Sequence, residues 1–210
     1  MLKFLVADDH PVVRAGVRQV IENNFEVDLI DEVGTCQEVL EKVWRHPYDI
    51  VLLDITMPGR SGLEVLKQLR RDRYTTPILV LSIHPEKQYA IRVLKAGASG
   101  YLNKISATDE LVDAIRVVLQ GEKYISPSLA KALASYIESG ERESPHESLT
   151  NREFEVLNMI ASGDSLKKIA EKLGLSVKTI SAHRANILRK MKMNSNAELI
   201  RYVIEKGLFE

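Results

Sequence analysis

Cysteine is almost absent from this sequence of 210 residues, which contains Cys36 alone. A single cysteine cannot form an intramolecular disulfide, and no His and Cys residues have the spacing of zinc ligands. Long apolar runs are also missing, since no stretch approaches the roughly 20 residues that span a bilayer. The amino terminus turns acidic at Asp8 and lacks the apolar core of a signal peptide. These absences favour a soluble, cytoplasmic protein with no membrane partner.

Net charge is absent as well, because 29 basic residues balance 29 acidic ones. The two signs are unevenly distributed: residues 1–149 carry a net charge of −4, and residues 150–210 carry +4. A basic segment beside an acidic one suggests that only the basic part meets a polyanion such as DNA. Many solvated helical domains reach a similar charge, so the charge alone leaves the partner open.

Residues 1–120 alternate short apolar runs with amphipathic segments. Continuous apolar runs of this length are typical of strands buried on both faces of a parallel sheet. The runs are Leu2–Ala7, Val27–Val33, Ile50–Leu53, Ile78–Leu81 and Ser99–Leu102, and the helical patterns lie near 11–22, 35–45, 61–71, 86–96 and 107–119. Five strand-helix units predict a small α/β domain, a five-stranded parallel doubly wound sheet with helices on both faces.

From Gly121 onward the pattern changes. Pro127–Glu138 predicts one short helix, within a segment, 121–145, that is expected to link two domains. Residues 146–210 show no strand pattern. They predict an all-α domain of four helices, at 150–162, 165–173, 177–192 and 195–206.

Polar residues mark several of the expected helix starts. Capping boxes, in which two side chains satisfy free backbone N–H groups at a helix start, are expected at Thr35–Glu38, Ser61–Glu64, Thr150–Glu153 and Ser195–Glu198. Asp164 and Ser176 are expected to act as single N-caps.

Five polar residues follow apolar runs of the expected sheet. Ligands of open α/β sheets bind beyond the carboxyl ends of the strands. The residues at those ends are Asp8, Asp9, Asp54, Ser82 and Lys104. Three converging carboxylates repel one another, so a divalent cation is expected to neutralise them, and Mg²⁺ suits a site of hard oxygen ligands.

The chemistry expected of this acidic group is phosphoryl acceptance. A carboxylate can attack a phosphoryl group to give an acyl phosphate, and such a transfer depends mainly on positioning and on charge neutralisation. Asp54 is the expected nucleophile, becoming a 4-aspartylphosphate, because it stands alone at a central strand end. Asp9 is expected to bind the metal, and Asp8 to bind it directly or through water. Lys104 and Ser82 are expected to contact phosphoryl oxygens.

A plainer interpretation competes with this one. A single Asp after an apolar strand is most often a helix cap or a loop residue, and Asp8 and Asp9 could cap the first helix. That interpretation weakens because all five polar positions fall at strand ends of one sheet.

The second expected domain contains a helix-turn-helix pattern. Leu166, Ile169, Ala170 and Leu173 form one apolar face, and Gly174–Ser176 reads as a tight turn between two helices. On the next helix the side opposite the core contains Lys178, Ala182, Ala185, Arg189 and Lys192, with Ser181 at its flank. Small residues and cations suit entry into a DNA major groove, but this surface alone could equally be a solvated helix face.

Longer motifs in residues 1–120 resemble the receiver domain of bacterial two-component response regulators. They are VADDH at 6–10, LLDITMPGRSG at 52–62, LS at 81–82 and GASGYLNK at 97–104. The resemblance implies a flavodoxin/CheY-like fold and phosphorylation of Asp54. It also implies a metal at Asp9, Asp54 and the backbone carbonyl of Thr56, and switching through Ser82 and Tyr101.

Residues 146–208 resemble the LuxR-type helix-turn-helix domain of NarL/FixJ response regulators. The resemblance is carried by LTNREFEVL at 149–157 and IAEKLGLSVKTISAHR at 169–184. It implies double-stranded promoter DNA as partner, contacted by Lys178, Thr179, Ser181, Ala182, Arg184 and Ala185; the helix pattern adds Arg189. Arg184 lies nearer the core edge and is expected to reach phosphate only.

The expected protein is therefore a transcription regulator, not an enzyme, phosphorylated by a partner sensor histidine kinase. The last helix carries the apolar residues Leu199, Ile200, Val203, Ile204 and Leu208, and in the family this helix pairs two DNA-binding domains. A homodimer is expected in the phosphorylated or DNA-bound form. RNA polymerase is a further candidate partner.

Three other functions compete with a phosphorylation-controlled regulator. A phosphatase or phosphotransferase of the haloacid-dehalogenase kind needs a second Asp two residues after the nucleophile, where this chain has Thr56. A nucleotide-binding Rossmann protein needs a glycine-rich loop after the first strand, which is absent. A regulator that binds DNA regardless of phosphorylation stays open.

Overall fold

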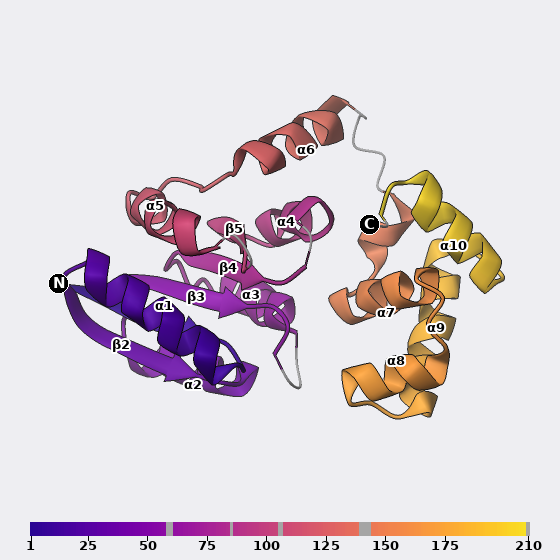
Figure 1. Cartoon of the computed structure of the whole chain (residues 1–210), viewed down its shortest axis with the longest axis horizontal. Helices are drawn as coiled ribbons and strands as arrows, with labels where there is room; N and C mark the ends of the chain where they lie inside the picture. Colours follow the sequence, from indigo (N-terminus) through magenta and orange to yellow (C-terminus); the bar gives the residue numbers. More distant parts are fainter. Residues whose placement is uncertain (58–60, 85, 105–106, 139–143, 209–210) are drawn as a thin grey trace. The chain divides into compact units, whose positions relative to one another are not determined.

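The computed structural model of the chain describes residues 1–57, 61–84, 86–104, 107–138 and 144–208 (Figure 1). The chain divides into two compact units, Met1–Ser139 and Gly140–Glu210. Part of the motif at 52–62, namely residues 58–60, lies outside the described residues. Among the described helices, none has both the length and the apolar character needed to cross a membrane.

A sheet of five parallel strands forms the centre of the first unit (Figure 1). The strand order β2-β1-β3-β4-β5 is that of a doubly wound fold. The strands are β1 (Leu2–Ala7), β2 (Val27–Val33), β3 (Ile50–Asp54), β4 (Ile78–Ser82) and β5 (Gly100–Asn103). The predicted fold class is confirmed, and β3 and β4 extend one residue further than predicted, to Asp54 and Ser82.

Helices cover both faces of this sheet. They are α1 (Pro11–Asn24), α2 (Cys36–Arg45), α3 (Gly62–Arg71), α4 (Glu86–Lys95) and α5 (Ala107–Leu119). One core cluster joins α1 and α5 to the sheet, with Ile21 and Ile115 packed around Phe4 and Ile50. Helices α2 and α3 contact each other, and α4 packs against β5. All five residues of β3 and all five of β4 are buried, as expected of central strands covered on both sides.

The segment after α5 returns along the edge of the sheet. The Tyr124 N–H donates to the Ser99 carbonyl at 2.8 Å, and Tyr124 forms an isolated bridge with Gly100. Gly100 permits this approach, because a Cβ at this position would lie 2.9 Å from the Cβ of Tyr124. Helix α6 (Pro127–Glu138) then packs against α4. The short helix expected within 121–145 therefore exists, and it belongs to the first compact unit.

Helices make up the described part of the second unit. A 3₁₀ turn, η1 (Pro145–Ser148), precedes α7 (Asn151–Ala161), α8 (Leu166–Leu173), α9 (Val177–Met191) and α10 (Asn196–Glu205). Their core consists of fully or almost fully buried side chains, among them Phe154, Leu157, Ile180, Ile187, Leu199 and Val203. The predicted all-α, four-helix domain is confirmed.

The helix starts agree only partly with the caps expected from the sequence. Complete capping boxes occur at Thr35 and at Thr150, and Ser176 caps α9 by accepting from the Thr179 N–H at 3.0 Å. The boxes predicted at Ser61 and Ser195 are wrong: the Ser61 hydroxyl accepts from the Leu63 N–H and not from that of Glu64, and the Glu198 carboxylate accepts from the Asn194 N–H and the Ser195 hydroxyl.

Asp164 is not the N-cap of α8, so this prediction is also wrong. The helix begins one residue later, with Ser165 as N-cap accepting from the Lys168 N–H at 3.3 Å. The Asp164 carboxylate instead pairs with the ammonium groups of Lys168, at 2.7 Å, and Lys172, at 2.6 Å. Hydrogen bonds between a carboxylate and two ammonium groups are stronger than those from neutral backbone N–H groups.

Candidate functional site

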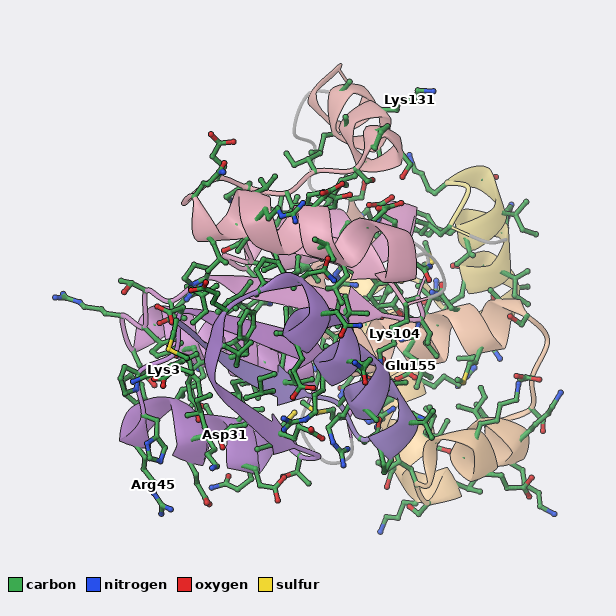
Figure 2. All side chains as sticks on the ribbon, turned by 60° about the vertical axis from the view of Figure 1, so that its left-hand side comes forward. Lys3, Asp31, Arg45, Lys104, Lys131 and Glu155 are labelled. Carbon is green, nitrogen blue, oxygen red and sulfur yellow. The ribbon has the colours of Figure 1, made fainter. Side chains whose placement is uncertain are left out.

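The polar residues expected to converge do lie at one edge of the sheet. Asp8 and Asp9 follow β1 directly, Asp54 and Ser82 end β3 and β4, and Lys104 follows β5. Since these strands are adjacent and parallel, their carboxyl ends meet at the same edge. Figure 2 shows Lys104 on the opposite side of the unit from Lys3, which lies near the beginning of β1.

Lys104 bridges two buried carboxylates. Its Nζ atom is 2.6 Å from Oδ2 of Asp54 and 2.6 Å from Oδ2 of Asp8, and both aspartates are only 2% exposed. The other Asp54 oxygen, Oδ1, accepts from the backbone N–H of Thr56 at 2.8 Å. Asp54 is thus held by one cation and one backbone donor, in a fixed orientation.

Burial controls the ionisation of this group. It raises the pKa of the Asp54 carboxyl, more than the hydrogen bonds from Lys104 and Thr56 lower it. Burial alone would lower the pKa of the Lys104 ammonium, but its bonds to Asp54 and Asp8 outweigh burial and raise that pKa. Lys104 therefore stays charged, in a position to neutralise an anion at Asp54.

The carboxylates also offer the ligand set of a hard cation. Ligand atoms from Asp8, Asp9, His10 and Asp54 all lie within 4.8 Å of one another. Carboxylate oxygens in such a cluster fit Mg²⁺, which keeps several waters when bound to proteins. The carbonyl of Thr56 stays a prediction.

His10 is a member of this cluster that the sequence interpretation missed. Its Nδ1 atom lies 2.7 Å from Oδ1 of Asp9, and its backbone N–H donates to Oδ1 of Asp8 at 2.9 Å. The available signal was its position directly after the two aspartates, since imidazole is a common metal ligand.

Ser82 and Tyr101, expected to form a switch, are both fully buried. The Ser82 hydroxyl oxygen accepts from the His84 N–H at 3.1 Å, and the Tyr101 hydroxyl donates to the His84 carbonyl at 2.7 Å. Burial raises the pKa of Tyr101, so its hydroxyl remains a donor. The side-chain amide of Asn103 donates to the same carbonyl at 3.3 Å. His84 therefore connects Ser82, Tyr101 and Asn103, a role that its side chain could not have indicated.

Gly62 is a second residue that the sequence interpretation missed. A Cβ at this position would lie 2.3 Å from the backbone oxygen of Asp54 and 2.7 Å from the Cα of Ile55. The first residue of α3 therefore packs directly on the backbone that carries the nucleophile. In the sequence, the signal was a glycine inside an expected helix, where it lowers helix propensity.

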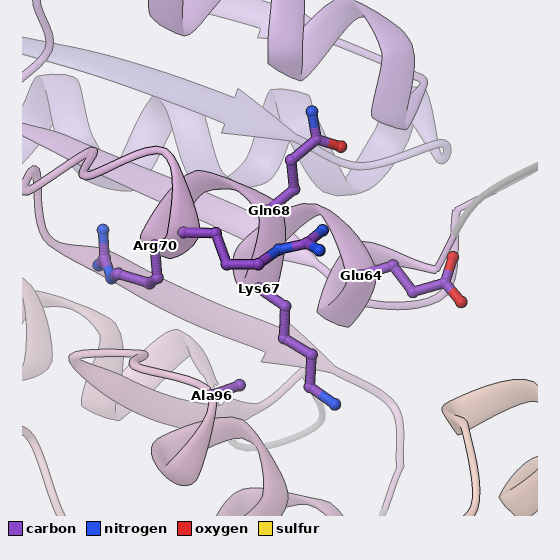
Figure 3. Close-up of a pocket in the computed structure, with 6 residues that line it drawn as sticks. Glu64, Lys67, Gln68, Arg70 and Ala96 are labelled. Atoms are coloured by element: carbon purple, nitrogen blue, oxygen red, sulfur yellow. The ribbon is translucent and has the colours of Figure 1, made fainter.

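A surface groove of about 770 Å³ lies elsewhere in the first unit, lined by Glu64, Lys67, Gln68, Arg70, Arg71 and Ala96. Figure 3 shows Glu64, Lys67 and Gln68 pointing in different directions from α3. Arg70 is committed to backbone carbonyls, donating to Gly97 at 2.9 Å and to Thr76 at 3.1 Å. The groove shares no residue with the acidic site.

In the second unit the turn between α8 and α9 has the expected construction. Gly174 adopts a left-handed conformation with φ of 62°, and Ser176 caps α9. Of the residues expected at DNA, those exposed on α9 are Lys178, Thr179, Ser181, Ala182, Ala185 and Arg189. Lys192, expected on the same helix face, is the C-cap of α9 in a left-handed conformation.

Arg184 and Lys190 serve the packing of this unit. Arg184 is half-buried, and its Nε donates to Oδ1 of Asn196 at 2.6 Å, joining α9 to the start of α10. The Lys190 ammonium donates to the buried Glu153 carboxylate at 2.6 Å. Burial lowers the pKa of the half-buried His183.

Two family descriptions match the chain. Residues 4–116 match the response regulator receiver domain, and residues 147–203 match the luxR family of bacterial regulatory proteins. The chain is 35% identical over 209 residues to the response regulator UvrY of Escherichia coli strain K12, covering 99% of this chain and 96% of that protein. It is 33% identical to the oxygen regulatory protein NreC of Staphylococcus carnosus, over the full length of both.

Solved structures resemble the chain as well. RcsB of Salmonella enterica serovar Typhimurium, bound to a promoter in the presence of the phosphomimetic BeF3−, matches with a TM-score of 0.61 and 25% identity over 96% of this chain and 97% of that one. A LuxR-family response regulator from Aurantimonas is 33% identical, with a TM-score of 0.61, over 65% of this chain and 98% of that one.

Proposed function

This chain belongs to the response regulators that join a receiver domain to a LuxR-type DNA-binding domain, and we propose that Asp54 is the residue whose phosphorylation controls it. The observation that carries the proposal is the setting of Asp54. Its carboxylate is 2% exposed, lies 2.6 Å from the Lys104 ammonium, and belongs to a cluster with Asp8 and Asp9. A buried carboxylate with its own cation and further acids beside it is suited to accept a phosphoryl group.

The transfer requires little covalent chemistry from the chain. An Asp54 oxygen attacks phosphorus in the phosphohistidine of a partner sensor kinase, and the P–N bond breaks with its electron pair leaving on the imidazole. Lys104 moves no proton; its charge neutralises a phosphoryl oxygen. The Ser82 hydroxyl, fully buried at the adjacent strand end, donates to another phosphoryl oxygen.

Asp8, Asp9, Asp54 and the Thr56 carbonyl would hold Mg²⁺. When bound, the ion supplies positive charge against the carboxylates and the phosphoryl oxygens. Of the three carboxylates, Asp8 and Asp54 pair with Lys104, whereas Asp9 pairs with His10 at 2.7 Å, so a metal at Asp9 would compete with an imidazole and not with the buried ammonium.

Binding to promoter DNA is assigned to α9. Its exposed side offers two cations, Lys178 and Arg189, for phosphates, while Ser181, Ala182 and Ala185 permit close approach to base edges. Thr179 lies at the same exposed start of the helix. Arg184 is expected to reach phosphate only after giving up its bond to Asn196, which makes it the weakest of the proposed contacts.

The apolar residues of α10 divide into two sets, and this supports a dimer. Leu199 and Val203 are fully buried in the unit, whereas Ile204 is 65% exposed. A phosphorylated or DNA-bound homodimer that pairs this helix would cover Ile204 and read two half-sites about one helical turn apart. RNA polymerase is a further candidate partner, and the cytoplasm is where a bacterial regulator meets its promoter.

The test replaces Asp54 with Asn and incubates the full chain with acetyl phosphate and Mg²⁺. Phosphoryl uptake, followed by mass spectrometry, should be lost because the amide cannot form the acyl phosphate. Promoter binding should then no longer respond to the phosphodonor in a titration with labelled DNA.

Asp49→Asn is the matched control. Asp49 precedes the same strand at its other end, where its carboxylate accepts from the Lys3 N–H at 2.7 Å. This variant should take up phosphoryl groups like the wild type. Full uptake by Asp54→Asn would reject Asp54 as acceptor, whereas uptake without any change in DNA affinity would reject the proposed control.

A further inference from the structure

One carboxylate on α4 holds the start of helix α6. The Ser126 hydroxyl donates to Oε1 of Glu86 at 2.5 Å, and the Ser128 hydroxyl donates to Oε2 of the same residue. Ser126 is 6% exposed and also caps α6, accepting from the N–H of the fully buried Leu129 at 3.1 Å. Hydroxyl bonds to a carboxylate are stronger than bonds between neutral groups. The first turn of α6 is therefore fastened to α4 at Glu86.

Glu86 lies only four residues after Ser82, and His84, which lies between them, is tied to Ser82. His84 gives its N–H to Ser82, and its carbonyl accepts from both Tyr101 and Asn103. Its ring stacks on that of Tyr89 in α4, with the centroids 4.3 Å apart. A displacement of Ser82 would therefore reach the first turn of α4 through a continuous set of contacts.

A separate contact holds the chain just before α6. The Tyr124 hydroxyl donates to Oε2 of Glu110 in α5 at 2.9 Å, and the Tyr124 N–H bonds to the edge of the sheet. Neither of these two hydrogen bonds has a partner in α4 or in the segment after Ser82; Glu86 acts on Tyr124 only through its charge, which adds to burial in raising the pKa of the hydroxyl. Loss of the Glu86 bonds would thus free α6 from α4 while the chain stays anchored at Tyr124.

We propose that Glu86 is a positioning residue that makes the attachment of α6 to α4 depend on phosphorylation. The inference rests on the proposed phosphorylation of Asp54. In the unphosphorylated chain Glu86 holds both serines. When Ser82 turns to donate to a phosphoryl oxygen, the His84 N–H loses Ser82 as its acceptor, His84 and the first turn of α4 move, and Glu86 releases α6. Because α6 is followed directly by the second unit, its release changes the tether of the DNA-binding domain.

Hydrogen–deuterium exchange of the full chain, with and without BeF3− and Mg²⁺, tests this. Amides of α6 in the wild type should exchange roughly tenfold faster with the phosphoryl mimic, because local opening becomes more frequent. In Glu86→Ala, α6 should exchange fast under both conditions, so the ratio between them falls to about one. Glu86→Gln and Ser128→Ala, which each keep part of the contact, should give intermediate ratios.

Glu64→Ala is the matched control, since Glu64, like Glu86, is a glutamate in the first turn of a helix, here α3, and is exposed. It should keep the wild-type ratio. If Glu86 were only a passive brace, its replacement would speed exchange equally with and without the mimic and leave the ratio unchanged, which would overturn the inference.

Two wild-type results separate this inference from the proposed function. Complete phosphoryl uptake by acetyl phosphate with no change in α6 exchange would overturn the role of Glu86 and leave Asp54 as the acceptor. No uptake at all would overturn the proposed function and this inference together.

Discussion

In the first unit, Asp54 and Ser82 are 2% and 0% exposed, whereas in the second unit Lys178 and Ala182 lie on the exposed side of α9. The difference follows from what each site has to do. Accepting a phosphoryl group needs charges held in a medium where they act strongly, and burial provides that. Reading DNA needs side chains that reach outward. Changes at the first site should therefore alter stability along with function, and changes at the second should alter function alone.

Both units also contain a buried carboxylate, and the two behave differently. Burial raises the pKa of Asp54 despite its neighbours. Burial alone would raise the pKa of Glu153 too, but the hydrogen bonds from Lys190 and Thr150 outweigh it and lower that pKa. The ionised form of Asp54 is thus disfavoured where it lies, as can be the case for a reactive group. The ionised form of Glu153 is favoured, because its hydrogen bonds outweigh burial, and it stabilises the fold.

Gly62→Ala should have the largest effect, on the first unit alone. A Cβ 2.3 Å from the Asp54 carbonyl oxygen forces the backbone of the nucleophile to move. We expect the rate of phosphorylation by acetyl phosphate to fall by about 100-fold, since misplacing a reacting group by about 1 Å costs this much. Overpacking should also cost roughly 1–3 kcal/mol of stability. Fluorescence of Trp44, the single tryptophan, reports on this unit's unfolding.

The control for Gly62 is Gly16→Ala. A Cβ at Gly16, inside α1, would meet no atom within 4 Å. This variant should phosphorylate normally and gain about 0.5–1 kcal/mol of stability, because alanine favours a helix interior. A normal rate in Gly62→Ala would show that the approach of α3 does not fix Asp54.

Lys190→Met should have the next largest effect, on the second unit alone. It leaves the Glu153 carboxylate, 4% exposed, without its cation. Removing one partner of a buried ion pair typically costs roughly 3–5 kcal/mol of stability. Because Glu153 keeps its bonds from Thr150, we expect a loss of about 3 kcal/mol. Exchange of the α7 and α9 amides measures this loss. Lys168→Met is the control: this exposed lysine pairs with Asp164, which keeps Lys172 as a second cation, so exchange should stay close to that of the wild type.

The same chemical change should have opposite effects on stability at the two buried carboxylates. Because the folded-state pKa of Asp54 is raised, its ionisation costs stability as pH rises past its unfolded pKa, so Asp54→Asn should stabilise the first unit by about 1 kcal/mol at pH 7. The folded-state pKa of Glu153 is lowered, so its contribution is present above its unfolded pKa and is lost as pH falls through the folded one. Glu153→Gln should therefore destabilise the second unit at pH 7, by about 1 kcal/mol.

Both stability changes are measured in EDTA at pH 7. Thermal unfolding followed by Trp44 fluorescence reports on the first unit, and amide exchange reports on the second. Below the folded pKa of Glu153 the difference between wild type and Glu153→Gln should disappear. If both variants changed stability in the same direction at pH 7, the proposed difference between Asp54 and Glu153 would be refuted.

The fold was predictable because its signals are local and repeated. Apolar runs such as Ile50–Leu53 and turn residues such as Gly174 act through neighbours in the sequence. The prediction of a cap failed where the choice between two neighbouring residues depended on their tertiary partners. Asp164 could cap α8 by residue type, but Lys168 and Lys172 take its carboxylate, and Ser165 caps instead.

The convergence of the acidic site was predictable for a similar reason, since strand ends of a parallel sheet meet at one edge. The residues that act through their backbone, or across distant segments, were not. Gly62 matters because of an atom it lacks, and His84 because of its peptide group. Glu86 and Ser126 are 40 residues apart, and their contact depends on the path of the chain between them.

Lys178→Ala should have the smallest effect and should show function separated from stability. Lys178 is exposed, at the second position of α9, and no ion pair of the described residues involves it. Removing one phosphate contact should weaken binding by roughly tenfold, similarly for all DNA sequences, and reduce the slope of log affinity against log salt by about 1.

Unfolding of the second unit should be unchanged in Lys178→Ala, within about 0.5 kcal/mol, because no buried group loses a partner. Lys167→Ala on α8, an exposed lysine outside the proposed DNA contacts, is the control and should keep the wild-type salt slope. A lower unfolding temperature in Lys178→Ala would show that the exposed site also supports its fold. Since the contact is electrostatic, the difference in DNA affinity between the two lysine variants should become smaller as the salt concentration rises. A difference that stays constant in titrations at several salt concentrations would indicate a contact of another kind.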